Sequence, residues 1–393
     1  MEIKKKGELT AQGTKASQRA LRKNFAFFAR PLRSRPNGMA GRALRLGFWP
    51  FCFLLASCQK PGNNNPAPSG NYQHGVWFID EGLFTAGNAG LDFYHLDKDT
   101  LETNVFQNIN GKPLGDVLES MYHYNGHYYL VVNGSNEVLV VDDKTLKVST
   151  VIPYIVYPRY FLPVSNQKAY VTDNTNEGIN IIDLQTNTVA GKITYDPKPN
   201  PDSAYASWTE QMVQYHSNVF VAAVKTGKLL IINSITDKIT DTISLSIGLK
   251  DLVMDAQNRI WALCDGTLAT PYINSRLFCL DTTGKILKSY TFPDPGTGTG
   301  NLTINATDDT LFYIHSGVYK LGINQNSLSS SSIIDGTGHD FYGLGVNPLN
   351  SDIYVGDALN FTQPGIVFQY NSAGKLLKTH HCGVGPNGFL FVN

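Results

Sequence analysis

The chain has 393 residues, and its 32 Lys and Arg residues balance its 32 Asp and Glu residues. The balance conceals a split, because residues 1–57 carry twelve basic and two acidic residues, whereas the rest carries 20 basic and 30 acidic residues. A basic head on an acidic body predicts two parts with different fates. The head shows neither strand alternation nor a helical face, which argues against a folded nucleic-acid-binding module.

Residues 39–57 are predicted to be an export signal. Arg42 and Arg45 precede an apolar run that is followed by small residues, the order expected of a signal peptide. The run is too short to span a bilayer as a permanent helix. The last four residues, Leu-Ala-Ser-Cys ending at Cys58, resemble a bacterial lipobox. The resemblance implies cleavage before Cys58 and acylation of that residue; the alternative is an ordinary free or buried cysteine.

The position of this signal predicts how the N-terminal part is divided. A start at Met39 gives a signal of ordinary length, so residues 1–38 are predicted to be upstream sequence outside the native protein. Residues 58–74 are rich in Pro, Gly and Asn, which predicts a flexible tether. Gln59 and Lys60 stand where surface-exported lipoproteins of the Bacteroidetes type usually carry acidic residues. Both a cell-surface and a periplasm-facing orientation therefore stay open.

Residues 75–393 repeat one pattern: an apolar strand, then Asp or Asn, then a polar turn and another strand. The spacings between the Asp or Asn positions are 45, 41, 50, 48, 43 and 47 residues. Their side chains can bond to the backbone two residues on and so tighten the turn. These positions are Asp97, Asp142, Asp183, Asn233, Asp281, Asn324 and Asn371.

Two further strands precede each of these turns, which gives four strands per repeat. Four-stranded units at this period predict an all-β, seven-bladed β-propeller. The first unit, which begins "GVWFIDEG", lacks its leading strand, and the chain ends on a lone strand, "NGFLFVN". Pairing of this C-terminal strand into the first blade would close the ring and remove the exposed edges.

The segment "KAYVTDNTNEGINIIDLQTNTVAGKI" is similar to the YVTN repeat of YncE-like propellers. Together with the lipobox, it resembles outer-membrane lipoproteins of Bacteroidetes, a group that includes surface cobalamin-binding proteins working with TonB-dependent transporters. The resemblance implies a monomeric, lipid-anchored binding protein for a small molecule or glycan, with a corrinoid as the favoured ligand. Fold alone does not identify a ligand. No cofactor, metal or nucleic acid is expected.

The long loops are predicted to lie on one face of the propeller, which we call the rim face, and the short turns on the other. Long loops on a rigid scaffold commonly carry binding residues. Arg159 and Arg276 are expected there as cations for an anionic or hydrogen-bond-accepting ligand group. The candidate ligand-binding residues are Phe84, Tyr154, Tyr157, Arg159, Tyr160, Tyr205, Trp208, Tyr272, Arg276, His339, Tyr342 and Phe361.

The sequence contains no recognisable catalytic motif, neither Gly-x-Ser-x-Gly nor His-Glu-x-x-His. His380-His381-Cys382 could place at most two ligands on one side of a strand, too few for a typical zinc site. The expected protein is therefore not an enzyme. Two alternatives stay open: a protein- or glycan-interaction propeller without a small ligand, and a polysaccharide lyase using His339, Tyr342 and Arg159.

Three cysteines remain after Cys58, namely Cys264, Cys279 and Cys382. Cys264 and Cys279 lie on consecutive predicted strands and could form a disulfide in an oxidising compartment. Buried free thiols are the favoured interpretation.

Overall fold

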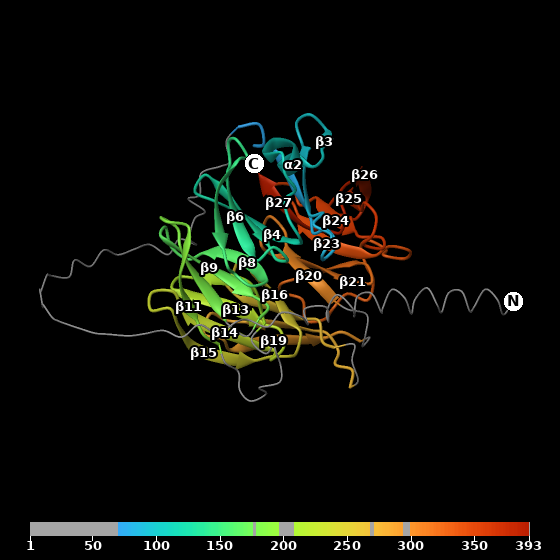
Figure 1. The fold of residues 1–393 in the computed structure, drawn as a ribbon. Coiled ribbons are helices and arrows are strands. Elements are labelled where there is room, and N and C mark those ends of the chain that lie inside the picture. Colours follow the sequence, from blue (N-terminus) through green and yellow to red (C-terminus); the bar gives the residue numbers. More distant parts are fainter. Residues whose placement is uncertain (1–69, 176–177, 196–207, 268–270, 294–298, 393) are drawn as a thin grey trace, which may run out of the picture. The chain divides into compact units, whose positions relative to one another are not determined.

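A computed structural model describes residues 70–175, 178–195, 208–267, 271–293 and 299–392, all of which belong to one compact unit. Their strands form seven antiparallel sheets arranged as the blades of a β-propeller (Figure 1). The predicted fold class is thus confirmed. The predicted signal, Cys58 and the tether up to residue 69 lie outside the described residues.

The first three blades follow the chain order, starting from a sheet that contains both ends of the propeller. Blade 1 consists of β27 (Pro386–Val392), β1 (Gly75–Asp80), β2 (Gly90–His95) and β3 (Thr100–Glu102). Blade 2 consists of β4 (Leu118–Tyr124), β5 (His127–Val132), β6 (Glu137–Asp142) and β7 (Val148–Pro153). Blade 3 consists of β8 (Pro158–Pro163), β9 (Lys168–Asp173), β10 (Ile179–Asp183) and β11 (Thr188–Ile193).

The remaining blades repeat this order. Blade 4 consists of β12 (Thr209–Tyr215), β13 (Asn218–Ala223), β14 (Lys228–Asn233) and β15 (Lys238–Ser244). Blade 5 consists of β16 (Leu249–Met254), β17 (Ile260–Cys264), β18 (Arg276–Leu280) and β19 (Ile286–Thr291). Blade 6 consists of β20 (Thr299–Ile304), β21 (Thr310–His315) and β22 (Val318–Gly322). Blade 7 consists of β23 (Phe341–Val346), β24 (Ile353–Asp357), β25 (Ile366–Tyr370) and β26 (Leu376–His381).

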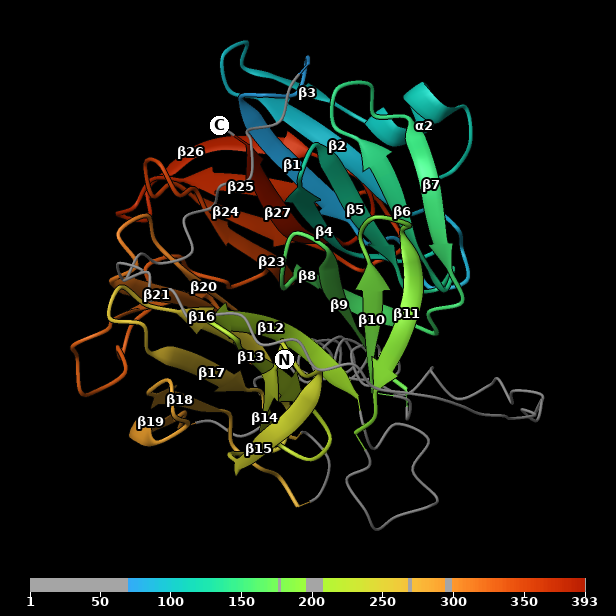
Figure 2. The same ribbon diagram turned by 90° about the vertical axis from the view of Figure 1, so that its left-hand side faces the viewer.

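The last strand closes the ring. Strand β27 pairs antiparallel with β1, with Ile79 opposite Gly388, and the two strands lie side by side in Figure 2. The C-terminal strand therefore completes the first blade as predicted. Without β27, blade 1 would lack its innermost strand and the inner edge of β1 would be unpaired.

The apolar core lies between neighbouring blades. Each cluster of buried side chains draws on two adjacent sheets, and Trp77 of blade 1 meets Tyr128 of blade 2 with ring centroids 5.7 Å apart. Central strands such as β1 and β24 are buried along their whole length. Sheets covered on both faces explain why these strands are apolar at consecutive positions.

The predicted turn mechanism holds in five of the seven repeats. Asp142 Oδ1, for example, accepts hydrogen bonds from the backbone N–H groups of Lys144 (3.2 Å) and Thr145 (2.8 Å). Asp183, Asn233, Asp281 and Asn371 accept equivalent bonds. Asp97 and Asn324, although described, form no such bond.

Blade 6 departs from the prediction of four strands. Its outer position is taken by a Ser-rich segment in which only Ile334 bridges to Val318. Serine-rich sequence lacks the β-branched and aromatic side chains that favour a regular outer strand. The described residues also include one short helix, α2 (Val105–Asn110), which the sequence pattern did not predict. No helix in the described part of the chain is long and apolar enough to cross a membrane.

Candidate functional site

The innermost strand of every blade contains a β-bulge near its first residues. In blade 2, for example, Leu118 pairs with Val132 and Ser120 with Val131, so Glu119 is the extra residue of the bulge. A bulge bends the strand and redirects the side chain of the extra residue. The residues that fall outside the strand register at these bulges are Asn387, Glu119, Arg159 with Tyr160, Glu210 with Gln211, Lys250, Asn301 with Leu302, and Tyr342.

These bulged segments connect each blade to the next. Asn387 Nδ2 of blade 1 donates to the backbone oxygen of Glu119 in blade 2, at 3.1 Å. Ser120 Oγ of blade 2 donates to the backbone oxygen of Arg159 in blade 3, at 2.7 Å. Backbone groups that a bulge removes from the sheet ladder are thereby satisfied by a side chain of the preceding blade.

Between blades 4, 5 and 6 the direction of the hydrogen bond is reversed, because the backbone of the later blade donates and a side chain of the earlier blade accepts. The backbone N–H of Leu252 in blade 5 donates to Gln211 Oε1 of blade 4, at 2.9 Å. The backbone N–H of Leu302 in blade 6 donates to the carboxylate of Asp251 in blade 5. Here the earlier blade supplies the acceptor.

The last two connections run through Tyr342 of blade 7. Asn301 Nδ2 of blade 6 donates to the backbone oxygen of Tyr342, at 2.5 Å. The hydroxyl of Tyr342 in turn donates to Glu81, which follows β1 of blade 1. Together with the pair between blades 3 and 4 described next, a polar contact joins every neighbouring pair of blades. We call this set of contacts the polar ring.

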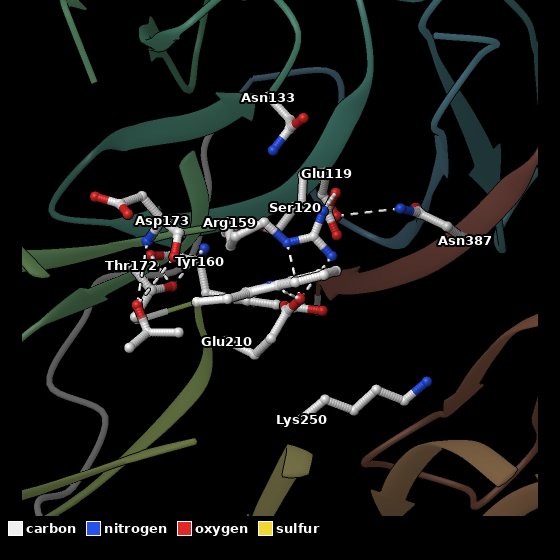
Figure 3. Close-up of polar contacts among 12 residues, drawn as sticks. Glu119, Ser120, Asn133, Arg159, Tyr160, Thr172, Asp173, Glu210, Lys250 and Asn387 are labelled. Atoms are coloured by element: carbon white, nitrogen blue, oxygen red, sulfur yellow. Dashed lines mark hydrogen bonds and ion pairs between the residues drawn. The ribbon is translucent and has the colours of Figure 1, made fainter. Parts of the chain in front are cut away.

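Arg159 is the centre of the most strongly charged part of the polar ring (Figure 3). Its guanidinium bonds to Glu119 of blade 2 and, through Nη2 at 2.8 Å, to Oε1 of Glu210 in blade 4. Exposure of the three side chains is only 19%, 7% and 5%. Burial alone would lower the pKa of Arg159, but the two carboxylates outweigh burial and raise it.

Two aromatic side chains adjoin this cluster. The indole N–H of Trp208 donates to Glu210 Oε1 at 2.7 Å, and the guanidinium carbon of Arg159 lies 5.7 Å from the Trp208 ring centroid. The Lys225 ammonium lies 4.9 Å from the same ring. Burial, followed by the charges of Glu210 and Glu119, raises the pKa of Tyr160 well above its usual value.

Blade 5 contributes a second charged cluster. Lys250 Nζ lies 3.2 Å from Asp265 Oδ2, and Asp251 is buried between these groups and Glu210. Burial raises the pKa of Asp251 to about 6, and its Oδ2 has no hydrogen-bond partner among the described residues. Buried polar atoms without a partner are uncommon in native proteins and mark places where a ligand or water can bind.

The structure brings together some of the residues predicted from sequence. Arg159, Tyr160 and Tyr342 lie in the polar ring, and Trp208 contacts it. Arg159, however, belongs to strand β8 and not to a loop, and two carboxylates compensate its charge. The placement of Arg159 in a loop is therefore wrong, and its role toward an anionic or hydrogen-bond-accepting ligand group stays a prediction.

Arg276, the second predicted cation, is also a strand residue and not a loop residue. It is the first residue of β18, and its guanidinium carbon lies 4.6 Å from the Phe278 ring centroid. Tyr205 lies outside the described residues. The remaining predicted aromatics lie apart from the polar ring or at its border. Phe84 approaches Tyr157 at 6.5 Å between centroids, and Tyr342 meets Phe361 at 4.7 Å.

Two predicted aromatics project from the surface. Tyr154 is 90% exposed and Tyr272 is 61% exposed. Tyr154 and Tyr157 both have positive φ, 67° and 46°, which bulky residues rarely adopt. The loop that holds them is anchored by the fully buried Ile155 and by a hydrogen bond from Tyr157 N–H to Asn136 Oδ1 at 2.8 Å.

His339 lies in the loop that leads into β23. Its Nδ1 is 2.7 Å from Oδ2 of Asp357, a residue with no exposed surface at the end of β24. The sequence did not predict this pair, since eighteen residues separate its members.

The acidic members of the polar ring, notably Glu119 and Glu210, were not predicted from the sequence. A signal was present, since the innermost strands of blades 2 to 5 each carry a charged residue at their second position. These residues are Glu119, Arg159, Glu210 and Lys250. Charged side chains inside otherwise apolar strands need partners, and the alignment of the repeats would have placed them side by side.

His380 packs as an ordinary residue of strand β26, and Cys382 is buried directly after the end of that strand. The His380 ring lies 4.3 Å from the Tyr94 ring, and burial lowers the pKa of His380 to about 4. Cys264, Cys279 and Cys382 are free and buried. Cys264 and Cys279 belong to cores on opposite faces of blade 5, which prevents a disulfide. Within the described ranges, no three His, Cys, Asp or Glu side chains are arranged to hold a metal ion.

Comparison with solved structures supports the fold. A quinonprotein alcohol dehydrogenase-like protein from Bacteroides thetaiotaomicron aligns with a TM-score of 0.61 at 18% identity, over 82% of this chain and 79% of that one. The periplasmic gluconolactonase of Pseudomonas aeruginosa aligns with a TM-score of 0.61 at 11% identity, over 81% and 99%. Identities this low show a shared fold and nothing about activity.

Sequence comparisons identify a family without an assigned activity. A search of curated protein sequences finds no significant match. The model of the family described as "Domain of unknown function (DUF5074)" matches residues 74–383, nearly the whole propeller. The chain therefore belongs to the DUF5074 family.

Proposed function

We propose that this propeller binds an extracellular nutrient on its rim face, with a corrinoid as the ligand to test first, and passes it to a TonB-dependent transporter. The observation that carries the proposal is the polar ring. Seven bulges place polar side chains, including the charged cluster around Arg159, at one level of the innermost strands. Several polar groups gathered next to aromatic side chains are typical of ligand sites.

The proposed location follows from the sequence of the N-terminal part. In this proposal Cys58 is acylated and anchors the protein in the outer membrane, and the propeller is tethered through residues 58–74. The resemblance to YncE-like lipoproteins of Bacteroidetes supports this location and the choice of ligand. Multiple acyl chains would give stable anchoring without a spanning helix.

A second candidate function is the binding of a protein or glycan without a small ligand. Tyr154 favours it, because a 90% exposed tyrosine on a hydrogen-bonded loop resembles a preorganised anchor of an interface. Loss of partner binding in Tyr154→Ala, with unchanged small-molecule binding, would favour this candidate.

A polysaccharide lyase is supported less. A lyase reaction would need the Arg159 guanidinium and the Tyr342 hydroxyl to contact the substrate. Arg159, however, is paired with Glu119 and Glu210, and the Tyr342 hydroxyl donates to Glu81. We therefore propose binding and not catalysis. Release of unsaturated products from acidic polysaccharides by the purified protein would reverse this choice.

Tryptophan fluorescence offers a direct test on residues 63–393, which form one compact unit. Trp77 and Trp261 are fully buried, so Trp208 is the one partly buried tryptophan among the described residues. We expect saturable quenching by cyanocobalamin, with a lower affinity in Trp208→Ala. Trp208→Ala should weaken binding by about 1–3 kcal/mol, measured by calorimetry, whereas Lys285→Ala on the opposite face should not. An affinity that is unchanged in Trp208→Ala would contradict the assignment of the site.

A further inference from the structure

His339 on the rim face is held in one orientation. Its Nδ1 is 2.7 Å from Asp357 Oδ2, and the other oxygen of Asp357 accepts the backbone N–H groups of Asp340 (3.0 Å) and Leu359 (2.9 Å). Three hydrogen bonds therefore fix a fully buried carboxylate. Because a carboxylate only accepts hydrogen bonds, Nδ1 carries the proton and the lone pair of the neutral ring is on Nε2.

Aromatic contacts fix the plane of the same imidazole. Phe341 stacks on it with centroids 5.0 Å apart and planes 10° apart, and Phe368 meets it edge-on at 5.1 Å. The side chain of His339 is nevertheless 36% exposed. Nε2 has no hydrogen-bond partner in the part of the chain that the structure describes. The result is an oriented lone pair that a ligand can reach.

We infer that His339 Nε2 is an axial ligand for a metal held in a flat macrocycle that binds on the rim face, an inference that rests on the proposed function. Histidines that bind metals usually donate their other ring N–H to a carboxylate, as His339 does to Asp357. One histidine cannot build a metal site alone, because such sites need three or four ligands. The metal must therefore arrive with most of its ligands, as cobalt does in a corrinoid and iron does in a haem.

Neighbouring rim residues suit a flat ligand. Tyr342, three residues after His339, packs edge-on against Phe361 at 4.7 Å. Phe361 itself has a positive φ of 61°. Leu359, whose backbone N–H donates to Asp357, has a φ of 53°. Strained backbone of this kind concentrates at binding sites, where the surrounding structure compensates its cost.

The test compares two corrinoids on the purified full-length protein. Aquocobalamin has an exchangeable water on its upper axial position, whereas cyanide occupies that position in cyanocobalamin. We expect aquocobalamin to bind about tenfold more tightly and to acquire the absorption spectrum of an imidazole adduct. His339→Gln, which can still bond to Asp357, should remove both effects. The matched change His216→Gln, on the short hairpin between β12 and β13, should remove neither.

The other possible results distinguish failure of axial ligation by His339 from failure of the proposed corrinoid ligand. Equal affinity for both corrinoids, without a change in spectrum, would overturn axial ligation and leave the proposed function standing. If neither corrinoid binds, the proposed ligand is wrong, and a titration with haemin decides the inference. A change in the haemin Soret band that disappears in His339→Gln would support ligation of haem iron, and its absence would overturn the inference.

Discussion

Nη2 of Arg159 in blade 3 lies 2.8 Å from Oε1 of Glu210 in blade 4, and the same guanidinium bonds to Glu119 in blade 2. One side chain thus links three consecutive blades. Its removal leaves two buried carboxylates without a counter-charge, which is more costly than the loss of the ion pairs themselves. We expect Arg159→Met to lower the free energy of unfolding by about 3–5 kcal/mol, measured by urea denaturation.

The matched variants separate charge from packing. Lys144→Met, at an exposed position on the opposite face, should leave the unfolding midpoint unchanged. Adding Glu119→Gln and Glu210→Gln to Arg159→Met should recover a large part of the loss, because no uncompensated charge remains. A triple variant as unstable as Arg159→Met alone would show that packing, and not charge, explains the effect.

Ring closure predicts a strong dependence on the last strand. Removal of residues 386–393 deletes β27 and exposes the edge of β1, so the truncated chain should unfold several kcal/mol more easily or fail to fold. The point change Phe389→Ala keeps the strand but removes a ring that lies 5.6 Å from Phe78, and should cost about 2–3 kcal/mol. Leu377→Ala, 46% exposed on the outer strand of blade 7, is the control. Equal stability of all these variants would argue against closure.

Two buried carboxyl groups at this closure predict how stability depends on pH. Burial, and then the neighbouring Asp92, raises the pKa of Asp80 well above its usual value; burial raises the pKa of Asp92 to about 6. The folded state therefore binds protons more tightly than the unfolded chain. The stability that the pair contributes is complete below the ordinary aspartate pKa, about 4, and is lost as the pH rises through about 6.

Asp92→Asn should remove the part of this dependence that comes from Asp92, whereas Asp80, whose pKa is raised first by burial, remains. The amide oxygen of the variant can still accept the Asn104 N–H, now at 2.8 Å. Between about pH 4 and pH 8, the unfolding free energy of the unchanged protein should fall by roughly 2–3 kcal/mol relative to that of Asp92→Asn. Asp142, whose pKa is lowered by its bonds to Thr145, predicts the opposite sign for Asp142→Asn: its contribution to stability is present above the ordinary aspartate pKa, about 4, and is lost as the pH falls below it. Parallel stability curves for Asp92→Asn and the unchanged protein would show that the carboxyl pair does not titrate in this range.

The N-terminal prediction concerns processing. Mass spectrometry of the membrane fraction is expected to find acylated Cys58 as the first residue. Cys58→Ala should release the protein from the membrane, because it removes the attachment point of the acyl chains. Intact residues 1–57 in the mature protein would refute the lipoprotein interpretation.

The repeat of Asp- and Asn-anchored turns predicted the seven blades and their closure because it reflects local chemistry, which the sequence displays directly. The fourth strand of blade 6 was predicted wrongly, since a Ser-rich segment provides no local preference and tertiary contacts decide its path. The bulges were not predictable from apolar patterning. They depend on the crowding of seven strands around one axis, which no single repeat contains.

The charged cluster was hidden for a related reason. Arg159 lies 40 residues from Glu119 and 51 from Glu210, so each residue appears alone in its own repeat. An arginine among aromatic residues favoured a free cation for a ligand. Only the positions of neighbouring blades reveal that this arginine already has two partners.

The pairing of β1 with β27 also has a consequence for synthesis. The first strand of the propeller is made long before the strand that covers its inner edge, and the blades between them are translated in the interval. Closure of the ring must therefore await the synthesis of β27, and the loop that it closes spans almost the whole propeller. Until β27 has been synthesised, the inner edge of β1 has no partner strand, so the closed ring cannot form before the last strand of the propeller is available.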